Sequence, residues 1–489
     1  MKNTRILVLS LLAVLLLVAP FLQAYSSGSR VSWVTDVTSG SREFPQEVAL
    51  GPDRSVYVVG YTYGSFPGNR NHGGMDAFVA RVTGDGVLDR VYEFGSQGND
   101  VAGSVLVGGD GSVFVSGAVG GDLNGVANHG KFDGFIVRLS KDFHVQWTLV
   151  LGSGESDFIY DISQAGDGDI YAVGSTLGSI NGAVHKGDYD VFAAKVDGGS
   201  GKVVWVKNYG TGDEDQAFLS TVDGKGNLYI VGYTDGSFKG NANQGGEDVF
   251  AVKIDPSGKL LWAKQFGSPG DDEGKVVTIS PDGKYIYVAG STTDRMTSNI
   301  VGEQSWTDFF VAKLSTNNGG VVWVEQFGST GPVHQYDDEA YYITALPSGD
   351  ILVSGEAGGS LEAGSSNPSK TSTPFLLKLD ADGNVLSVQQ YGLYPGYAVT
   401  SIAEDSKGNT ILALGYTPQG YGAIHLVKLT ATDTQTMTST TSSQPASTSS
   451  SQSESQKTSS MLSKVNLQDP RVIIFILVAL IIIAAAAKI

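Results

Sequence analysis

The sequence predicts an all-β fold, a seven-bladed β-propeller of four-stranded blades that is closed by the N-terminal strand. Three observations predict it. A glycine-ended apolar strand recurs seven times, each repeat contains four short strand patterns, and the last repeat lacks a strand that the N-terminal region supplies. The repeats show no helical periodicity.

The glycine-ended strand defines the repeat. This strand consists of alternating apolar residues and ends in a glycine. The final glycines recur 57 to 65 residues apart. The seven copies span residues 56–60, 113–117, 170–174, 228–232, 286–290, 351–355 and 411–415. Repetition explains a region that is too long for one ordinary hydrophobic core.

Each unit adds three more strands. A second apolar strand closes on a basic residue, and a Gly-containing turn then leads in most units to a third strand that carries Trp, as in 260–267. A fourth strand, such as 217–222, precedes the glycine-ended one. Short strands joined by Gly, Asp and Asn turns are typical of propeller blades. The basic residues are Arg81, Arg138, Lys195, Lys253, Lys313, Lys378 and Lys428.

Closure of the ring follows from the two ends of the repeat region. The seventh unit stops at 429–433, before any Trp-bearing strand, whereas residues 31–35 form such a strand with no unit before it. We therefore expect residues 31–430 to form one propeller in which strand 31–35 completes the last blade. This arrangement removes an open sheet edge.

Five of the six tryptophans share one repeat position. Arg90 and Ser387 occupy this position in the other two units. So regular a placement favours packing between blades, with stacking against a ligand as the alternative. The five are Trp33, Trp147, Trp205, Trp262 and Trp323.

The repeat resembles a known family. The unit from Gly212 to Trp262 is similar to the SBBP-type beta-propeller repeats of exported bacterial and archaeal proteins, and its 255–262 stretch, Asp-x-Ser-Gly-Lys-x-x-Trp, resembles the tryptophan-docking motif of quinoprotein propellers. The resemblance covers residues 31–430 and implies the fold. It implies little about activity, because most such repeat proteins lack an assigned one.

The two ends of the chain predict export and anchoring. Residues 1–24 have the basic start, apolar centre and small final residue of a secretory signal peptide. Residues 431–464 are Ser/Thr-rich and predict a disordered stalk. Residues 470–488 contain sixteen consecutive apolar residues, 472–487, and predict a transmembrane helix. We expect a single-pass cell-membrane protein whose folded domain lies outside the cell.

The amino-acid composition excludes some classes of binding partner and of metal site. The chain has no cysteine, so disulfides and thiolate metal sites are excluded. The net charge is -18 and only 17% of residues are charged, which argues against nucleic acid as a partner. An acidic surface permits cations or basic surfaces.

A row of acids precedes the strand before each glycine-ended strand, with Ala398 as the exception in unit seven. One hypothesis is that each carboxylate accepts backbone N–H bonds of its own loop. The other is that the acids form an axial ring that binds a cation such as Ca²⁺. The row comprises Glu43, Asp100, Asp157, Asp215, Asp272 and Asp338.

A second acidic row is expected on the same face, just before the strand that closes on a basic residue. It comprises Asp76, Asp133, Asp190, Asp248 and Asp308. His72, His129 and His185 occupy equivalent loops but belong to blades that fan apart, which disfavours a shared metal. Residues 380–384 begin like a calcium loop, yet they lack its final Glu and predict a hairpin turn.

Two functions remain open. The first is a membrane-anchored cell-surface binding or structural protein that presents the propeller to glycans, surface-layer proteins or cations. The second is an anchored extracytoplasmic enzyme, polysaccharide-acting or quinoprotein-like, with a site near the divergent blades five and six. The uniform blades and the lack of a known catalytic motif favour the first function, with no catalytic residue and no certain cofactor.

Overall fold

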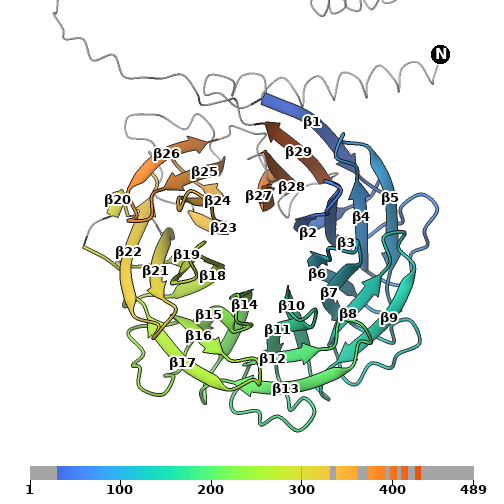
Figure 1. The fold of residues 1–489 in the computed structure, drawn as a ribbon, viewed down its shortest axis with the longest axis horizontal. Coiled ribbons are helices and arrows are strands. Elements are labelled where there is room, and N and C mark those ends of the chain that lie inside the picture. The colour runs from blue at the N-terminus through green and yellow to red at the C-terminus, as the bar shows by residue number, and fades with distance from the viewer. Residues whose placement is uncertain are drawn as a thin grey trace, which may run out of the picture. The chain divides into compact units, whose positions relative to one another are not determined.

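Seven antiparallel sheets follow one another along the chain and are arranged around a central axis (Figure 1). The computed structural model describes residues 30–298, 300–304, 306–330, 337–361, 373–390, 397–404, 409–416 and 424–430. The predicted signal peptide, stalk and membrane anchor lie outside the described residues. Within the described part of the chain, no helix is long and apolar enough to cross a membrane. The predicted all-β, seven-bladed propeller of four-stranded blades is confirmed.

In blades 1 to 6 four strands follow one another in sequence order from the axis outward, and we call them a, b, c and d; in blade 7, β1 takes the place of strand d. Blade 1 contains β2 (Glu43–Leu50), β3 (Val56–Thr62), β4 (Asp76–Val82) and β5 (Leu88–Phe94). Blade 2 contains β6 (Asp100–Val107), β7 (Val113–Val119), β8 (Asp133–Leu139) and β9 (Val145–Leu151). Blade 3 contains β10 (Asp157–Gln164), β11 (Ile170–Thr176), β12 (Asp190–Val196) and β13 (Val203–Tyr209). Blade 4 contains β14 (Asp215–Val222), β15 (Leu228–Thr234), β16 (Asp248–Ile254) and β17 (Leu260–Phe266).

The later blades carry the insertions. Blade 5 contains β18 (Asp272–Ile279), β19 (Tyr285–Thr292), β21 (Asp308–Ser315) and β22 (Val321–Gly328), and its insertion adds β20 (Ile300–Gly302) parallel to β22. Blade 6 contains β23 (Glu339–Ala345), β24 (Ile351–Ala357), β25 (Thr373–Leu379) and β26 (Val385–Gln390). Blade 7 contains β27 (Tyr397–Glu404), β28 (Thr410–Tyr416) and β29 (Ile424–Thr430), with β1 (Arg30–Val37) as its fourth strand.

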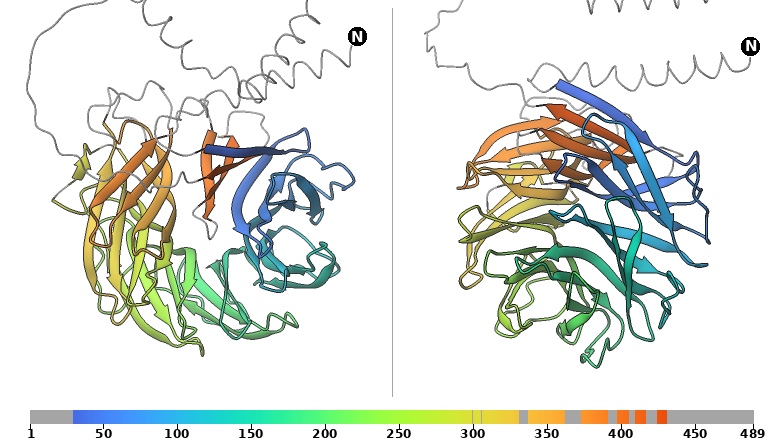
Figure 2. Two further views of the ribbon diagram at one scale, coloured as in Figure 1. Left: turned by 45° about the horizontal axis from the view of Figure 1, so that its top comes forward. Right: turned by 45° about the vertical axis from the view of Figure 1, so that its right-hand side comes forward.

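Strand β1 closes the ring as predicted. It pairs antiparallel with β29 from Arg30↔Thr430 to Val37↔Ile424, so the earliest and latest described strands lie side by side in Figures 1 and 2. The β29 edge, which would otherwise offer free N–H and C=O groups, is thereby paired along its length.

Burial explains why strands b and c carry the strongest sequence signal. Strand β15, for example, is buried at every position, because the neighbouring blades cover both of its faces. Strand d is exposed at its start, as at Leu260 and Leu261 of β17. The apolar core therefore lies between blades rather than within any single sheet.

A β-bulge in strand a creates contacts between blades. In β2, β6, β10 and β14 the pairing register with strand b shifts near the middle of the strand. Backbone N–H groups just beyond the shift donate to side chains of the preceding blade. The bonds run from Val48 to Ser401 Oγ (3.1 Å), Val105 to Glu47 Oε2 (2.7 Å), Ile162 to Ser104 Oγ (3.4 Å) and Ser220 to Asp161 Oδ2 (2.8 Å). Side chains of one blade thus accept hydrogen bonds from backbone N–H groups beside the bulge of the next blade. These bonds join neighbouring blades.

The register corrects one sequence alignment. Ala398 pairs with Gly415 in the way that Ala102 pairs with Gly117, so it occupies the third position of strand a and is not equivalent to Asp100. The equivalent position in unit seven is residue 396, which lies outside the described residues. The error arose because unit seven has no acid to anchor the alignment.

Candidate functional site at the axis

Strand a is the innermost strand of each blade, and its side chains alternate in exposure. In β6, β10 and β18 the first and third residues are buried and the second and fourth are partly exposed. Because the first and third residues pack into the blades, the second and fourth face the axis. The second position varies from blade to blade, as Phe44, Val101, Phe158, Gln216, Glu273 and Glu339.

The predicted acidic row lies at the first, buried position. Glu43, Asp100, Asp157, Asp215, Asp272 and Asp338 are each at most 2% exposed. Their own loops supply hydrogen-bond donors. Asp100 accepts bonds from the Ser96 N–H (2.6 Å) and Oγ (2.8 Å) and from the Gly120 N–H (3.1 Å), and Asp338 accepts from the Ser329 N–H (2.7 Å) and the Gly358 N–H (2.8 Å). This geometry supports the loop-bonding hypothesis over an open axial ring.

The second acidic row is buried in the same way. Asp76, Asp133, Asp190, Asp248 and Asp308 begin the c strands and are at most 1% exposed. One oxygen of Asp190 accepts the Lys186 N–H at 2.8 Å, and one oxygen of Asp248 accepts the Gln244 N–H at 2.9 Å. His72 and His129 donate their backbone N–H groups to Asp76 (2.6 Å) and Asp133 (2.5 Å). No cluster of three or more His, Cys, Asp or Glu side chains suited to a metal occurs in the described ranges.

The repeated tryptophans contact the next blade. Four indole N–H groups donate to carbonyl oxygens in the turn between strands c and d of the following blade. They are Trp33 to Gly84 (3.1 Å), Trp147 to Gly198 (3.3 Å), Trp205 to Pro256 (3.1 Å) and Trp262 to Thr316 (3.2 Å). The Trp323 indole packs against Gly383, where a Cβ would lie 3.4 Å from its ring. These contacts leave the rings between blades rather than free for a ligand.

Aromatic side chains gather at the axial end of blades 2 and 3. The Phe158 ring lies 5.8 Å from Phe132, 6.0 Å from Tyr160 and 6.5 Å from Tyr189, measured between centroids. All four side chains are partly exposed. Together they form a ring-faced surface of the kind that stacks on apolar faces of ligands.

Carboxylates gather next to these aromatic rings, in blades 4 and 5. Burial, followed by the negative charges of Glu273, Asp235, Asp271 and Glu214, raises the pKa of Glu247 to about 7. Burial and the charge of Glu214 also raise the pKa of Tyr189, which places Glu214 where the two groups of side chains meet. We call Phe132, Phe158, Tyr160, Tyr189, Glu214, Glu247 and Glu273 the axial site.

Hydrogen bonds and ion pairs fix the acidic half of the axial site. Glu214 Oε1 accepts bonds from Tyr233 Oη (2.8 Å) and Gln216 Nε2 (2.6 Å). Lys275 Nζ lies 3.3 Å from Glu273 Oε2 and 2.5 Å from Glu339 Oε2, so one cation bridges blades 5 and 6. No Lys, Arg or His forms an ion pair with Glu247 or Glu214 among the contacts of the described chain.

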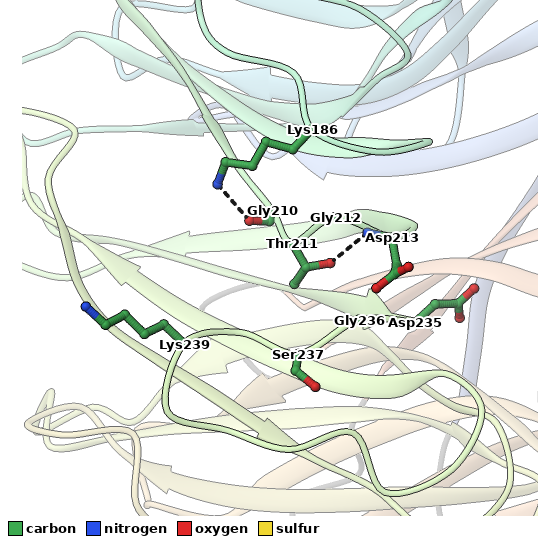
Figure 3. Close-up of a pocket in the computed structure, with 9 residues that line it drawn as sticks. All are labelled: Lys186, Gly210, Thr211, Gly212, Asp213, Asp235, Gly236, Ser237 and Lys239. Carbon is green, nitrogen blue, oxygen red and sulfur yellow. Dashed lines mark hydrogen bonds between the residues drawn. The ribbon is translucent and has the colours of Figure 1, made fainter.

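A polar pocket of about 510 Å³ adjoins the axial site between blades 3 and 4. Its acid Asp235 interacts electrostatically with Asp213, which also lines the pocket, and with Glu214 of the axial site. In Figure 3 the two lysines lie on one side and these two aspartates on the other, and Lys186 Nζ donates to the Gly210 carbonyl at 3.1 Å. The pocket is lined by Lys186, Gly210, Thr211, Gly212, Asp213, Asp235, Gly236, Ser237 and Lys239.

The insertions of blades 5 and 6, near which the sequence suggested a site for the alternative function, are described only in part. In blade 5 the inserted strand β20 follows β22 at the outer edge of the sheet, away from the axis, and Trp306 nearby in sequence is 64% exposed. The insertion of blade 6 falls largely on residues 362–372, outside the described residues.

Sequence reasoning missed the axial site because it followed positions that repeat. Glu214 and Glu247 each directly precede a repeated aspartate, and Glu273 directly follows one. The sequence prediction relied on residues that recur from blade to blade. These three glutamates are instead residues that differ between otherwise uniform blades. A search for variable residues directly beside the repeated acids would have found these three glutamates.

No family model and no curated protein matches the chain. The SBBP resemblance therefore stays a prediction. Among solved structures, polysaccharide lyase Uly1 is 11% identical with a TM-score of 0.45, over 83% of this chain and 100% of that one. The quinohemoprotein alcohol dehydrogenase ADHIIG from Pseudomonas putida HK5 is 10% identical with a TM-score of 0.45, over 88% and 80%. Both likenesses are too distant to carry an argument about this chain.

Proposed function

We propose that this protein is a membrane-anchored cell-surface receptor that binds neutral or amino-sugar glycans at the axial site. The observation that carries the proposal is the side-by-side placement of the Phe132, Phe158, Tyr160 and Tyr189 rings and the Glu214, Glu247 and Glu273 carboxylates. Rings offer stacking surfaces to the apolar faces of sugars, and carboxylates accept hydrogen bonds from hydroxyl or ammonium groups.

Charge narrows the ligand class. The acids outnumber the cations at the axial site, since Lys275 is already shared between Glu273 and Glu339. An anionic polysaccharide would meet repulsion there, whereas a neutral or basic glycan would not. The predicted signal peptide, stalk and anchor support presentation of this site outside the cell.

The test is glycan binding by the full-length chain, purified in mild detergent. A panel of neutral, amino-sugar and anionic polysaccharides is titrated by calorimetry against the wild type and a Phe158→Ala/Tyr189→Ala variant. We expect a neutral or amino-sugar ligand whose affinity drops at least about tenfold in the variant, because stacking of each ring contributes roughly 1 kcal/mol. Leu261→Ala, on the exposed outer strand, is the matched control. Binding of anionic glycans alone, or equal affinity of the variant, would contradict the proposal.

A second function, hydrolysis of a polysaccharide, is favoured by one observation. Glu247, with a pKa raised to about 7, lies near the Glu273 carboxylate, and acid/base pairs of this kind divide proton donor and acceptor roles. Release of reducing ends from a bound glycan by the wild type, and its loss in Glu247→Gln, would replace the receptor function with this one.

A further inference from the structure

The two rows of buried aspartates meet in pairs at the boundaries between blades. The first N–H of strand a donates to the residue that precedes strand c of the previous blade. The bonds run from Asp100 to Met75 O (2.8 Å), from Asp215 to Tyr189 O (2.7 Å) and from Asp272 to Glu247 O (2.8 Å). These bonds bring together Asp76 with Asp100, Asp190 with Asp215, and Asp248 with Asp272.

A glycine after strand d allows the two carboxylates of each pair to approach the same point of the backbone. A Cβ on Gly95 would lie 2.6 Å from both Asp76 Oδ1 and Asp100 Oδ2. On Gly267 it would lie 2.3 Å from Asp248 Oδ1 and 2.6 Å from Asp272 Oδ2, and on Gly210 it would lie 2.4 Å from Asp190 Oδ1 and 2.9 Å from Asp215 Oδ2. One oxygen from each of two aspartates therefore lies beside the same glycine, and the two oxygens lie close to each other.

In each pair, the oxygen contributed by the aspartate of strand c has no hydrogen-bond partner. Asp76 Oδ1, Asp190 Oδ1 and Asp248 Oδ1 are buried and accept no hydrogen bond. The three residues are 0%, 1% and 0% exposed. A buried oxygen without a donor costs roughly 1–3 kcal/mol, and more when it is charged, so its repetition at these three boundaries points to a ligand. Asp133 Oδ1 is also buried without a donor, but the three atoms nearest to a Cβ on Gly152 all belong to Asp133, so no second carboxylate is shown beside that glycine.

Protein cations do not neutralise the pairs. Among the ion pairs of the described chain, Asp190, Asp215, Asp248, Asp100 and Asp272 have none with Lys, Arg or His, and Asp76 has only His72 Nδ1 at 3.8 Å. Lys186, the nearest lysine in sequence to Asp190, donates to the Gly210 carbonyl instead. Two buried carboxylates at one position repel each other unless a proton or a cation lies between them.

We propose that each of these three pairs binds one Ca²⁺ ion, which joins strand c of one blade to strand a of the next. Carboxylate oxygens are the ligands that Ca²⁺ prefers, at about 2.3–2.6 Å. Each ion receives two protein carboxylates, and backbone oxygens or water complete its shell. We expect weak sites, with Kd on the order of 10⁻⁴ to 10⁻³ M, as in extracellular modules. The ions would supply the links between elements that a chain without cysteine lacks.

The test counts calcium on the full-length chain. Equilibrium dialysis with ⁴⁵Ca²⁺ should give three bound ions per wild-type chain, and removal of calcium with EGTA should lower Tm by several degrees. The Asp76→Asn/Asp248→Asn variant should bind one ion. Its matched control, Asp85→Asn/Asp382→Asn, makes the same charge change at exposed residues and should bind three.

Two results would overturn the proposal. One is a wild-type chain that binds no calcium and whose Tm is unchanged by EGTA, which would mean that each pair shares a proton or a water molecule. The other is an Asp76→Asn/Asp248→Asn variant that retains three ions while its circular dichroism spectrum stays that of the wild type. Because the wild-type count needs no substitution, a variant that fails to fold leaves the test intact. Glycan binding can fail independently of either result.

Discussion

At the scale of single residues, the axial site concentrates negative charge without a matching cation. Glu247 and Glu214 lie on successive blade boundaries, and Asp235 of the adjoining pocket adds a third charge whose pKa is also raised, mainly by burial. A ligand that supplies hydroxyl or ammonium donors would relieve this repulsion. Under the proposed function, the same residues would reduce stability and supply affinity, as functional residues often do.

Glu247 gives the first prediction at this scale. Its pKa is raised from 4.5 to about 7, so the folded protein holds a proton that the unfolded chain releases, and stability falls as pH rises between these two values. Glu247→Gln removes this loss. We expect the variant to have a higher Tm than the wild type at pH 8 and an equal Tm at pH 4, measured by differential scanning calorimetry.

The control for Glu247 is a glutamate whose pKa is shifted in the other direction. Bonding to Lys131 lowers the pKa of the exposed Glu155, so its contribution to stability is present above pH 4.5 and is lost as pH falls. Glu155→Gln should therefore leave Tm unchanged or slightly lower at pH 8. An equal rise in Tm for both variants at pH 8 would show that net charge, not the position of Glu247, is responsible.

At the scale of elements, the blades are joined by the turn between strands c and d. The indole of Trp147 in blade 2 lies over Gly201 of blade 3, where the backbone has φ +73° and a Cβ would lie 2.7 Å from the ring. The Trp147 N–H also donates to the Gly198 carbonyl of the same turn. The glycine is thus required both for its conformation and for the close approach of the neighbouring blade.

Gly201→Ala tests this contact. We expect it to destabilise the protein by about 1–3 kcal/mol more than Gly168→Ala does, measured by urea unfolding. Gly168 has φ +90° with no atom within 4 Å of an added Cβ, so the control shares the backbone strain but not the clash. In a Trp147→Ala background the excess should vanish. If it persists there, the ring of Trp147 is not its cause.

At the scale of the whole molecule, the ring depends on pairing between its two ends. Deletion of residues 30–37 removes β1 and exposes the β29 edge. We expect the truncated chain to have a lower Tm and to self-associate through this edge, as seen by size-exclusion chromatography with light scattering. A peptide of residues 30–37 added in trans should restore the monomer, whereas a scrambled peptide should not. A monomeric truncated chain with the Tm of the wild type would contradict closure.

The whole-molecule architecture was predictable because its causes repeat. Strands b and c are buried in every blade, so the same apolar pattern recurs and fixes the number of blades. The axial site was not predictable in this way, since Glu247 and Glu273 belong to different blades and lie 26 residues apart, and only the circular arrangement brings them together. Ala398 was misplaced because the seventh unit lacks the aspartate that anchors the others.

The alternation along strand a separates architecture from recognition. Its buried residues hold the blades together, while the residue between them faces the axis and contacts little of the core. Glu273 and Glu339 are an exception, because they share Lys275 and so join blades 5 and 6. At the other blades, under the proposed function, the ligand that the axis accepts could change one residue at a time while the buried positions of the scaffold stay the same.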